Sequence, residues 1–198
     1  MASITISRQL GSLGDDIAQI AAHRLGWLVI DRELINQAAF ESCSPEMVLT
    51  AVDELGLLGI HPSKKKCQAY LDAVERILHQ RADEGNLIIL GRAGQIILRG
   101  RPDVLHIRLH APRKVRIARI SSRQNISAEA ALEQIKASDR HRRWYLKHYY
   151  HAELNKPRYY DLEINTARLT AQAAADLICL AASLILNLSL PHEAHTNS

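Results

Sequence analysis

Short apolar segments alternate with longer amphipathic segments along the chain. Apolar or β-branched runs predict strands at residues 4–6, 28–30, 87–90, 104–109 and 161–164. The run at 87–90 (Leu-Ile-Ile-Leu) has no polar position, which is typical of a central parallel strand with helices on both faces. The alternation of strands and helices therefore predicts an α/β fold with a mainly parallel sheet and right-handed crossovers.

Apolar residues at helical spacing predict the helices of the N-terminal half. One helix is opened by Asp15 and Asp16 and ended by Gly26, and another covers residues 67–82. Residues 33–58 also have a helical pattern, but no clear boundary. Residues 61–66 contain a proline and three consecutive lysines and predict a loop.

The C-terminal half has clearer helix boundaries. Pro112 is expected as the first residue of a helix, because its missing N–H is unpaired there anyway. We expect further helices over residues 127–148, and Thr170 is expected to cap a long alanine-rich final helix. We expect one domain over residues 1–190 and a disordered tail over 191–198.

Composition narrows the class of protein. The chain has 198 residues, of which 47% are hydrophobic and 23% charged, enough for one substantial core. Its three cysteines (Cys43, Cys67 and Cys179) share no motif spacing, which disfavours disulfides and zinc and favours a reducing cytoplasm. Met1 is followed almost at once by the first strand, so we expect no signal peptide.

One apolar run near the C-terminus has the composition of a membrane-spanning helix but is too short to be one. It covers residues 177–186, whereas a bilayer needs roughly 20 residues. We therefore expect no membrane association. The run is better interpreted as a buried helix or as a contact in a homo-oligomer.

The charge is mildly basic, with a formal net value of +4 and a pI near 9.1. Arginines and histidines are concentrated between Arg99 and Arg158, which fits either a solvated surface or a phosphate-binding cleft. The histidines show no spacing typical of a metal site. His106 and His110 are expected to face outward or to cap strand ends.

The most informative residues follow directly after predicted strands. In parallel sheets, ligands bind beyond the carboxyl ends of the strands. Residues 8–14, the pair Asp31 and Arg32, and residues 91–94 all carry polar, charged or glycine residues at such positions. Their coincidence is the best indication of a binding site in the sequence.

The first of these segments has the features of a phosphate loop. A strand leads into Gly11, Ser12, Leu13 and Gly14, and a helix follows. The two glycines allow backbone N–H groups to converge on an anion, and the helix dipole adds positive potential. An ordinary tight turn between strand and helix is the alternative, because two glycines at this spacing are a weak signal alone.

Residues 4–14 resemble the opening of the cytidylate kinase-like family, a bacterial branch of the P-loop nucleoside monophosphate kinases. Further segments match that family in colinear order: residues 27–35, residues 85–112, and residues 139–150 together with 160–166. The resemblance covers roughly residues 3–180. It implies a P-loop NTPase-like three-layer fold with a helical lid at about residues 113–158.

The chain departs from the P-loop pattern at one critical place. A full P-loop ends in Gly-Lys-Ser/Thr, and relatives in this branch often have arginine at the lysine position. This chain has Gly14-Asp15-Asp16. A charge ~4 Å from a phosphate is worth roughly 4 kcal/mol at an effective dielectric of about 20, so reversing its sign should weaken binding severely.

Four interpretations of the two carboxylates fit the sequence. Asp15 or Asp16 binds Mg²⁺ between itself and the phosphates, or Arg8 substitutes for the missing cation. Alternatively, the site no longer uses ATP. The plainest interpretation is that both acids cap the helix, where the dipole favours them.

The resemblance also assigns acceptor and lid residues. Asp31 would hold a base or ribose, and Arg32 and Arg92 would hold an acceptor phosphate. For Asp31 and Arg32 the alternative is a surface ion pair. Lid arginines would neutralise the transferring phosphoryl group together with Arg92. These are Arg116, Arg123 and Arg142, for which a salt-bridged solvated helix is the alternative.

Three functions fit these residues. The first is phosphoryl transfer from ATP with Mg²⁺ to a nucleotide or another small phosphorylated molecule. The second is a nucleotide-binding or regulatory protein that kept the fold without catalysis. The third is nucleic-acid binding through the basic region of residues 113–158, which is the weakest because no recognised nucleic-acid motif occurs.

Overall fold

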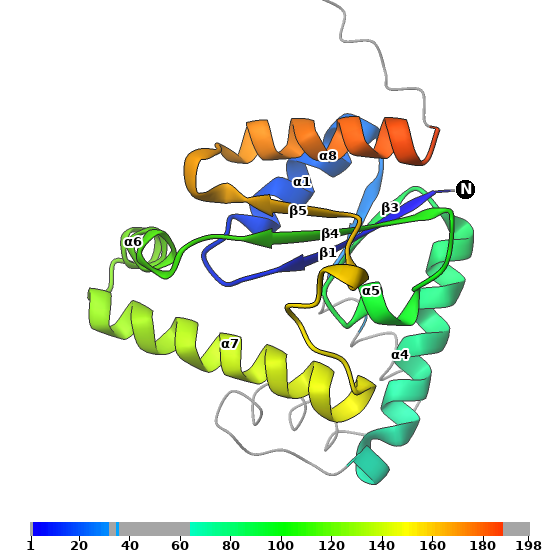
Figure 1. Cartoon of the computed structure of the whole chain (residues 1–198), viewed down its shortest axis with the longest axis horizontal. Coiled ribbons are helices and arrows are strands. Elements are labelled where there is room, and N and C mark those ends of the chain that lie inside the picture. The colour runs from blue at the N-terminus through cyan, green and yellow to red at the C-terminus, as the bar shows by residue number, and fades with distance from the viewer. Residues whose placement is uncertain (1, 32–34, 36–63, 188–198) are drawn as a thin grey trace, which may run out of the picture.

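The computed structural model describes residues 2–31, 35 and 64–187 (Figure 1). In this part of the chain the strands form one parallel sheet in the order β2-β3-β1-β4-β5. In chain order they are β1 (Ser3–Arg8), β2 (Leu28–Ile30), β3 (Leu87–Leu90), β4 (Val104–His110) and β5 (Leu162–Asn165). The register places Ile4 opposite both Ile88 and Leu105. The predicted parallel sheet and all five of its strands are confirmed.

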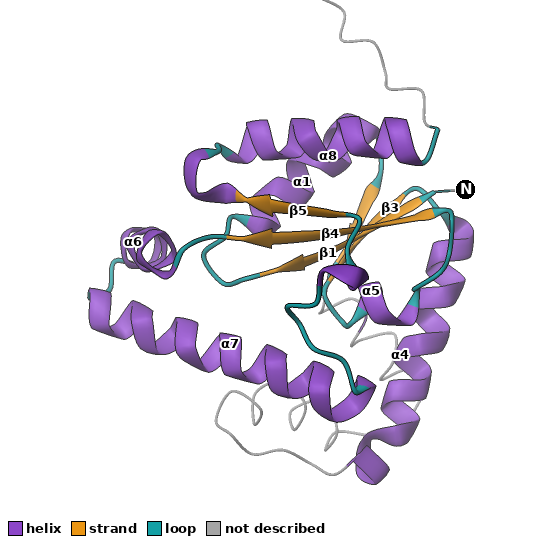
Figure 2. Cartoon of the chain, viewed as in Figure 1, coloured by secondary structure: helices purple, strands orange, loops and turns teal. Residues whose placement is uncertain are grey.

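Helices cover both faces of the sheet (Figure 2). Two of them, α1 (Gly14–Leu25) and α8 (Ala171–Ile185), pack together on one face. On the other face lie α4 (Lys64–Glu84), α5 (Gly94–Ile97) and α7 (Ala128–Tyr150). Beyond β4, α6 (Arg113–Gln124) packs against α7, and two 3₁₀ turns, Pro157–Tyr159 and Thr166–Arg168, flank β5. The three-layer fold is therefore confirmed.

The apolar strand β3 explains why the sheet is buried on both sides. Successive side chains of a strand point to opposite faces. Ile88 and Leu90 accordingly join the core beneath α1 and α8. Leu87 and Ile89 join the core beneath α4, α5 and α7. Every position of the strand is buried, as the sequence predicts for a central strand.

Several helix boundaries agree with the sequence and two differ. Gly26 ends α1 with a positive φ of 66°, and the Thr170 side chain accepts a hydrogen bond from the N–H of Ala173. Pro112 lies just before α6 as its N-cap, so its placement as the first helical residue was wrong. Residues 64–66 belong to α4, so the predicted loop ends earlier. The segment 33–58 lies outside the described residues except for helical, buried Ile35.

The final helix has two contrasting faces. Its inner face buries Ala174, Ala175 and Ile178 against the sheet core. Its outer face exposes large apolar side chains, among them Leu180 and Leu184. The predicted homo-oligomer contact at this helix stays a prediction. None of the described helices has the length and apolar character needed to cross a membrane.

His106 is buried in β4, so the prediction that it faces outward was wrong. Its Nδ1 lies 2.7 Å from the Thr5 hydroxyl on β1, and Asp161 accepts a hydrogen bond from its backbone N–H. Burial lowers the pKa of His106 below its usual 6.5, because the charged imidazolium loses hydration. His110, by contrast, is the last residue of β4 and is half-buried.

The buried imidazole predicts a loss of stability in mild acid. Between the lowered pKa of His106 and its usual 6.5, the unfolded chain binds more protons than the folded chain. The free energy of unfolding should therefore fall as pH drops below about 6.5, by up to ~1.4 kcal/mol per pH unit for one proton. Urea unfolding across this range measures the slope. The variant His106→Gln should reduce this slope, whereas the control His79→Gln, at an exposed site, should leave it unchanged. An unchanged slope in His106→Gln would show that His106 does not cause the pH dependence.

Candidate functional site

A cavity of about 750 Å³ lies beyond the carboxyl ends of β1 and β3. Its floor is formed by the ends of these strands and its opposite wall by α7. The lining residues that bear on chemistry are Ser7, Arg8, Asp15, Asp31, Arg92, Gln95, Ser138, His141, Arg142 and Tyr145. The volume is within the usual range of small-molecule sites, roughly 300–1,000 Å³. Its position agrees with the rule for parallel sheets.

Arg8 enters this cavity from the end of β1 by a narrow route. A Cβ atom added at Gly14 would come within 2.5 Å of the Arg8 Cβ and Cγ atoms. A Cβ atom added at Gly91 would come within 2.9 Å of the Arg8 Nη1 atom. The side chain therefore passes over two glycines, Gly14, where a Cβ would meet the base of the Arg8 side chain, and Gly91, whose φ of 82° itself favours glycine. This path fixes the position of the guanidinium.

The loop between β1 and α1 has the backbone of a tight anion-type turn. Gly11 has a φ of 82°, and a Cβ there would lie 2.9 Å from the Cβ of Arg116. Leu13, which precedes the helix, has a φ of 62°, a left-handed conformation that is uncommon for a residue with a side chain. The backbone N–H groups of the first helical turn have no partner inside the helix. The predicted strand, loop and helix start are therefore present, but residues 11–14 are not among the lining residues of the cavity, and phosphate binding by the loop stays a prediction.

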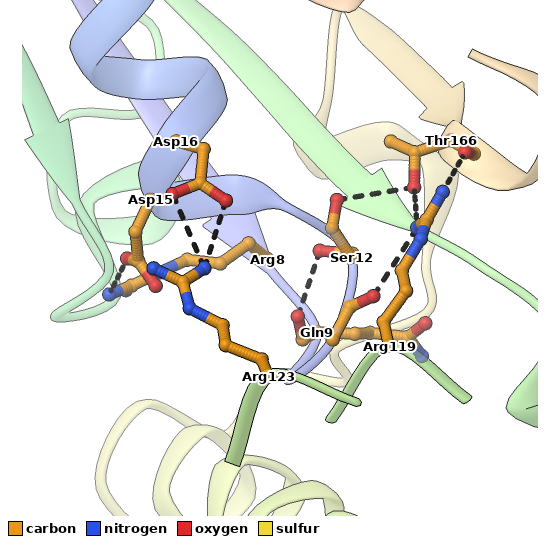
Figure 3. A network of polar contacts seen from close by, with 9 residues as sticks. Arg8, Gln9, Ser12, Asp15, Asp16, Arg119, Arg123 and Thr166 are labelled. Atoms are coloured by element: carbon orange, nitrogen blue, oxygen red, sulfur yellow. Dashed lines mark hydrogen bonds and ion pairs between the residues drawn. The ribbon is translucent and has the colours of Figure 1, made fainter. Parts of the chain in front are cut away.

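Side chains from distant elements hold this loop by its carbonyl groups (Figure 3). Arg119 on α6 donates to the Gly11 carbonyl at 3.3 Å and to the Thr166 carbonyl at 2.6 Å. The Thr166 hydroxyl donates to the Ser12 carbonyl at 3.1 Å. The Ser12 hydroxyl donates to the Gln9 carbonyl at 2.8 Å. These bonds to the carbonyl groups stabilise the loop in the observed backbone arrangement.

This support of the loop has almost no signal in the sequence. Thr166 belongs to a segment that resembles the family, but nothing in that segment indicates a bond to a loop 154 positions earlier. Arg119 is one of several arginines on α6, and nothing local in the sequence distinguishes it from the others. Burial lowers the pKa of Arg119, and its bonds to two carbonyls compensate for part of its lost hydration.

The two carboxylates at the start of α1 are each paired with an arginine (Figure 3). Asp15 accepts hydrogen bonds from Arg8 Nη2 at 2.8 Å and from Arg8 Nε at 3.1 Å. Asp16 accepts from Arg123 Nη1 at 2.9 Å. Asp15 lines the cavity and is 70% exposed, whereas Asp16 points toward α6 and is not among the lining residues. The two acids therefore have different places in the site.

Arg92 is the most deeply placed cation of the described cavity lining. It follows β3, has a φ of 49°, and is only 8% exposed. Its guanidinium carbon lies 6.0 Å from the ring centroids of both Tyr70 and Tyr145, which hold it by packing and cation–π attraction. A buried arginine with a left-handed backbone at the end of a strand is typical of a functional position, since neither feature improves solubility.

The other predicted site residues divide into two groups. Asp31 and Arg142 line the same cavity as Arg8 and Arg92. Arg116 does not line it, since its guanidinium is buried and bonded to both carboxylate oxygens of Asp139 at 3.1 and 2.9 Å. Arg123, paired with Asp16, also lies outside it. Arg32 lies outside the described residues.

Within the described residues, no three His, Cys, Asp or Glu side chains come together as a metal site. The described lining of the cavity instead combines three arginines, one histidine and two carboxylates with neutral hydrogen-bonding groups. Guanidinium groups suit phosphate oxygens, and carboxylates suit a hydroxyl, a base or a hard cation. The arrangement thus fits a ligand that carries phosphate together with neutral polar groups.

Cytidylate kinases are among the curated relatives. That of Methanococcus maripaludis is 33% identical over 108 residues, covering 53% of this chain and 60% of the relative. That of Sulfolobus acidocaldarius is 36% identical over 95 residues, covering 48% and 52%. A uronate isomerase of Corynebacterium glutamicum is 33% identical over 102 residues, which cover 52% of this chain and 19% of that protein. The chain spans about half to three fifths of the cytidylate kinases it matches.

Solved structures share the fold. An uncharacterised protein from Eubacterium ventriosum has a TM-score of 0.73 at 19% identity, with 96% of this chain and all of that chain covered. A gluconokinase of Sinorhizobium meliloti has a TM-score of 0.57 at 16% identity, with 94% of each chain covered. A shikimate kinase of Acinetobacter baumannii has a TM-score of 0.54 at 14% identity, with 96% of each covered.

These neighbours identify the fold as that of the P-loop kinases, in agreement with the strand–loop–helix geometry at the cavity. The model of the cytidylate kinase-like family matches residues 3–168, which include every described strand of the sheet and the whole loop between β1 and α1. On that match, this chain belongs to the cytidylate kinase-like family.

Proposed function

We propose that this chain transfers a phosphoryl group from ATP to a nucleoside monophosphate or a similar small phosphorylated acceptor. Family and fold support a nucleotide- or sugar-kinase-like phosphotransferase. The observation that carries the finer proposal is the meeting of Arg8 and Arg92, from two neighbouring strand ends, in one cavity of about 750 Å³. Phosphoryl transfer depends on alignment of two ligands and on neutralisation of their charge.

On the donor side, the loop amides and Arg8 would hold the ATP phosphates. Arg8 supplies a fixed positive charge in place of the absent P-loop lysine. Its present partner is the Asp15 carboxylate, at 2.8 Å. A donor phosphate would therefore compete with Asp15 for the same guanidinium, which is a weaker arrangement than an unpaired lysine.

The cavity also fits the Mg²⁺ that accompanies ATP in kinases. Mg²⁺ prefers oxygen ligands and usually takes one or two carboxylates together with substrate phosphates. Asp15 and Asp31 are carboxylates that line the cavity, whereas Asp16 is turned toward Arg123. The bound ion would supply positive charge to the phosphates during transfer.

On the acceptor side, Arg92 would hold the phosphate and Asp31 the base or ribose. Tyr70 and Tyr145 fix the Arg92 guanidinium before any ligand arrives, which reduces the entropy lost on binding. Arg142 on α7 lines the same cavity and would approach the transferring group from the lid side. Arg116 and Arg123 would act there only after release from Asp139 and Asp16.

A non-catalytic nucleotide-binding protein is the second candidate. The observation in its favour is the position of Asp15, whose charge neutralises Arg8 within the donor part of the cavity. A fold that keeps the acceptor pocket but binds triphosphate weakly would serve as a sensor. Turnover of ATP with a nucleoside monophosphate separates the two candidates, since a sensor binds without turnover.

Replacing Arg92 should remove recognition of the acceptor. Arg92→Ala should still fold, but lose the increase in unfolding temperature that CMP causes in the wild type. A hydrogen bond to a charged group is worth about 1.5–3 kcal/mol, so CMP affinity should fall roughly tenfold to a hundredfold. Calorimetric titration with CMP measures this loss. The control is Arg99→Ala, which removes an exposed arginine outside the cavity. A folded Arg92→Ala variant that binds CMP normally would show that Arg92 has only a structural role.

Reversing the charge of Asp15 tests the donor side. Asp15→Lys should raise ATP affinity in the absence of Mg²⁺, because a repulsive charge near the phosphates becomes attractive. Asp16→Lys is the matched control, since Asp16 starts the same helix but does not line the cavity. Titration of both variants with ATP, with and without Mg²⁺, measures the effect.

The same titration separates this role of Asp15 from metal binding and from helix capping. If the carboxylate recruits Mg²⁺, Asp15→Lys should weaken the metal dependence of binding and lower turnover. If it only caps the helix, the variant should lose about 1 kcal/mol of stability and bind ATP unchanged. If the wild type turns over ATP strongly and the Arg8→Ala variant does so equally well, Arg8 does not take the role of the absent P-loop lysine.

A further inference from the structure

A second cleft lies on the opposite face of α7 from the main cavity. It has a volume of about 210 Å³, and the described linings of the two have no residue in common. Its walls are Arg113 of α6 and five residues of α7, namely Ile135, Lys136, Asp139, Arg140 and Arg143. The α7 residues of the main cavity, such as Ser138 and Arg142, fall between these in sequence, so the helix presents two different walls. Figure 1 shows α6 and α7 side by side at this end of the molecule.

The charges in this cleft are not balanced within the described part of the chain. Arg113, Arg140 and Arg143 are exposed and have no ion pair or hydrogen-bonded partner among the described residues. Lys136 is paired with Glu133 at 2.7 Å. The cleft's own carboxylate, Asp139, is already bonded through both oxygens to buried Arg116. Asp139 therefore does little to offset the three exposed arginines.

The positive side chains of this cleft repel one another when no anion is bound. Like charges three or four positions apart on a helix repel each other. Lys136 and Arg140 are related by i, i+4, and Arg140 and Arg143 by i, i+3. Arg113 adds a further positive charge from the neighbouring helix. A bound anion would turn this repulsion into attraction.

We propose that this cleft is a second anion site, which binds a small polyphosphate independently of the phosphotransfer cavity. Its volume of about 210 Å³ is less than a third of that of the main cavity, which suits a group of pyrophosphate size better than a whole nucleotide. Planar guanidinium groups bind phosphate oxygens in pairs, which suits them to this ligand better than lysine. The ligand class is therefore a compact polyphosphate or the polyphosphate end of a larger molecule.

Inorganic pyrophosphate is the probe, titrated calorimetrically into the full chain at constant ionic strength. The double variant Arg140→Ala/Arg143→Ala should bind at this site at least about tenfold more weakly, because each charged hydrogen bond contributes on the order of that factor. The control Lys147→Ala/Arg168→Ala removes two exposed charges outside both cavities and should bind as the wild type does. The single variant Arg92→Ala should keep this binding event, which separates the site from the main cavity.

Three results would overturn the proposal. The first is wild-type pyrophosphate affinity in the Arg140→Ala/Arg143→Ala variant. The second is an equal loss in both double variants, which would indicate net charge alone. The third is an absence of pyrophosphate binding with binding of single-stranded DNA instead, which would indicate an extended nucleic-acid surface. Loss of CMP binding in Arg92→Ala with pyrophosphate binding retained would support both this site and the proposed function.

Discussion

The parallel pairing of β1 with β3 is the constraint on which the site depends. Both strands lie between helices on the two faces of the sheet, and Ile4 and Ile6 of β1 share one apolar core with Ile88 and Leu90 of β3, which favours a single register. That register sets Ile6 beside Leu90 and so brings the residues after each strand together. Arg8 and Arg92 meet in one cavity for this reason, although they lie far apart in sequence.

Hydrogen bonds from other elements then hold the loop between β1 and α1 in position. Arg119 and Thr166 hold the loop carbonyls of Gly11 and Ser12 from outside. Buried Arg116 bonds to the Leu10 carbonyl and to Asp139, so the loop, α6 and α7 share one polar connection. Buried ion pairs of this kind are poor sources of net stability, but breaking one is expensive. Arg116 and Arg119 of α6 thus support the loop in this structure.

The elements were predictable because each depends on local pattern and burial. The apolar run of β3, Gly26 after α1 and Thr170 before α8 each carry a signal that needs no distant partner. The cavity's place was predictable too, because carboxyl ends of parallel strands meet at one edge.

The side-chain partners were not predictable. Nothing local in the sequence indicates that Asp15 pairs with Arg8 and Asp16 with Arg123. The burial of Arg116 against Asp139 likewise depends on how α6 packs on α7. The burial of His106 was missed for the same reason, because its surroundings come from β1 and from the residues before β5.

The path of Arg8 has a consequence for how this chain can vary. The side chain occupies the space that a Cβ atom would need at Gly14 and again at Gly91. As long as an arginine stands at position 8, neither glycine can accept even a methyl group without displacing it. Shortening Arg8 to alanine would release neither position, because the Cβ of residue 8 would still lie 2.5 Å from a Cβ at Gly14, and Gly91 has a φ of 82°, which residues with a side chain rarely adopt. Among relatives with this backbone, position 14 should therefore stay glycine whatever side chain stands at position 8, and position 91 should stay glycine because of its own φ.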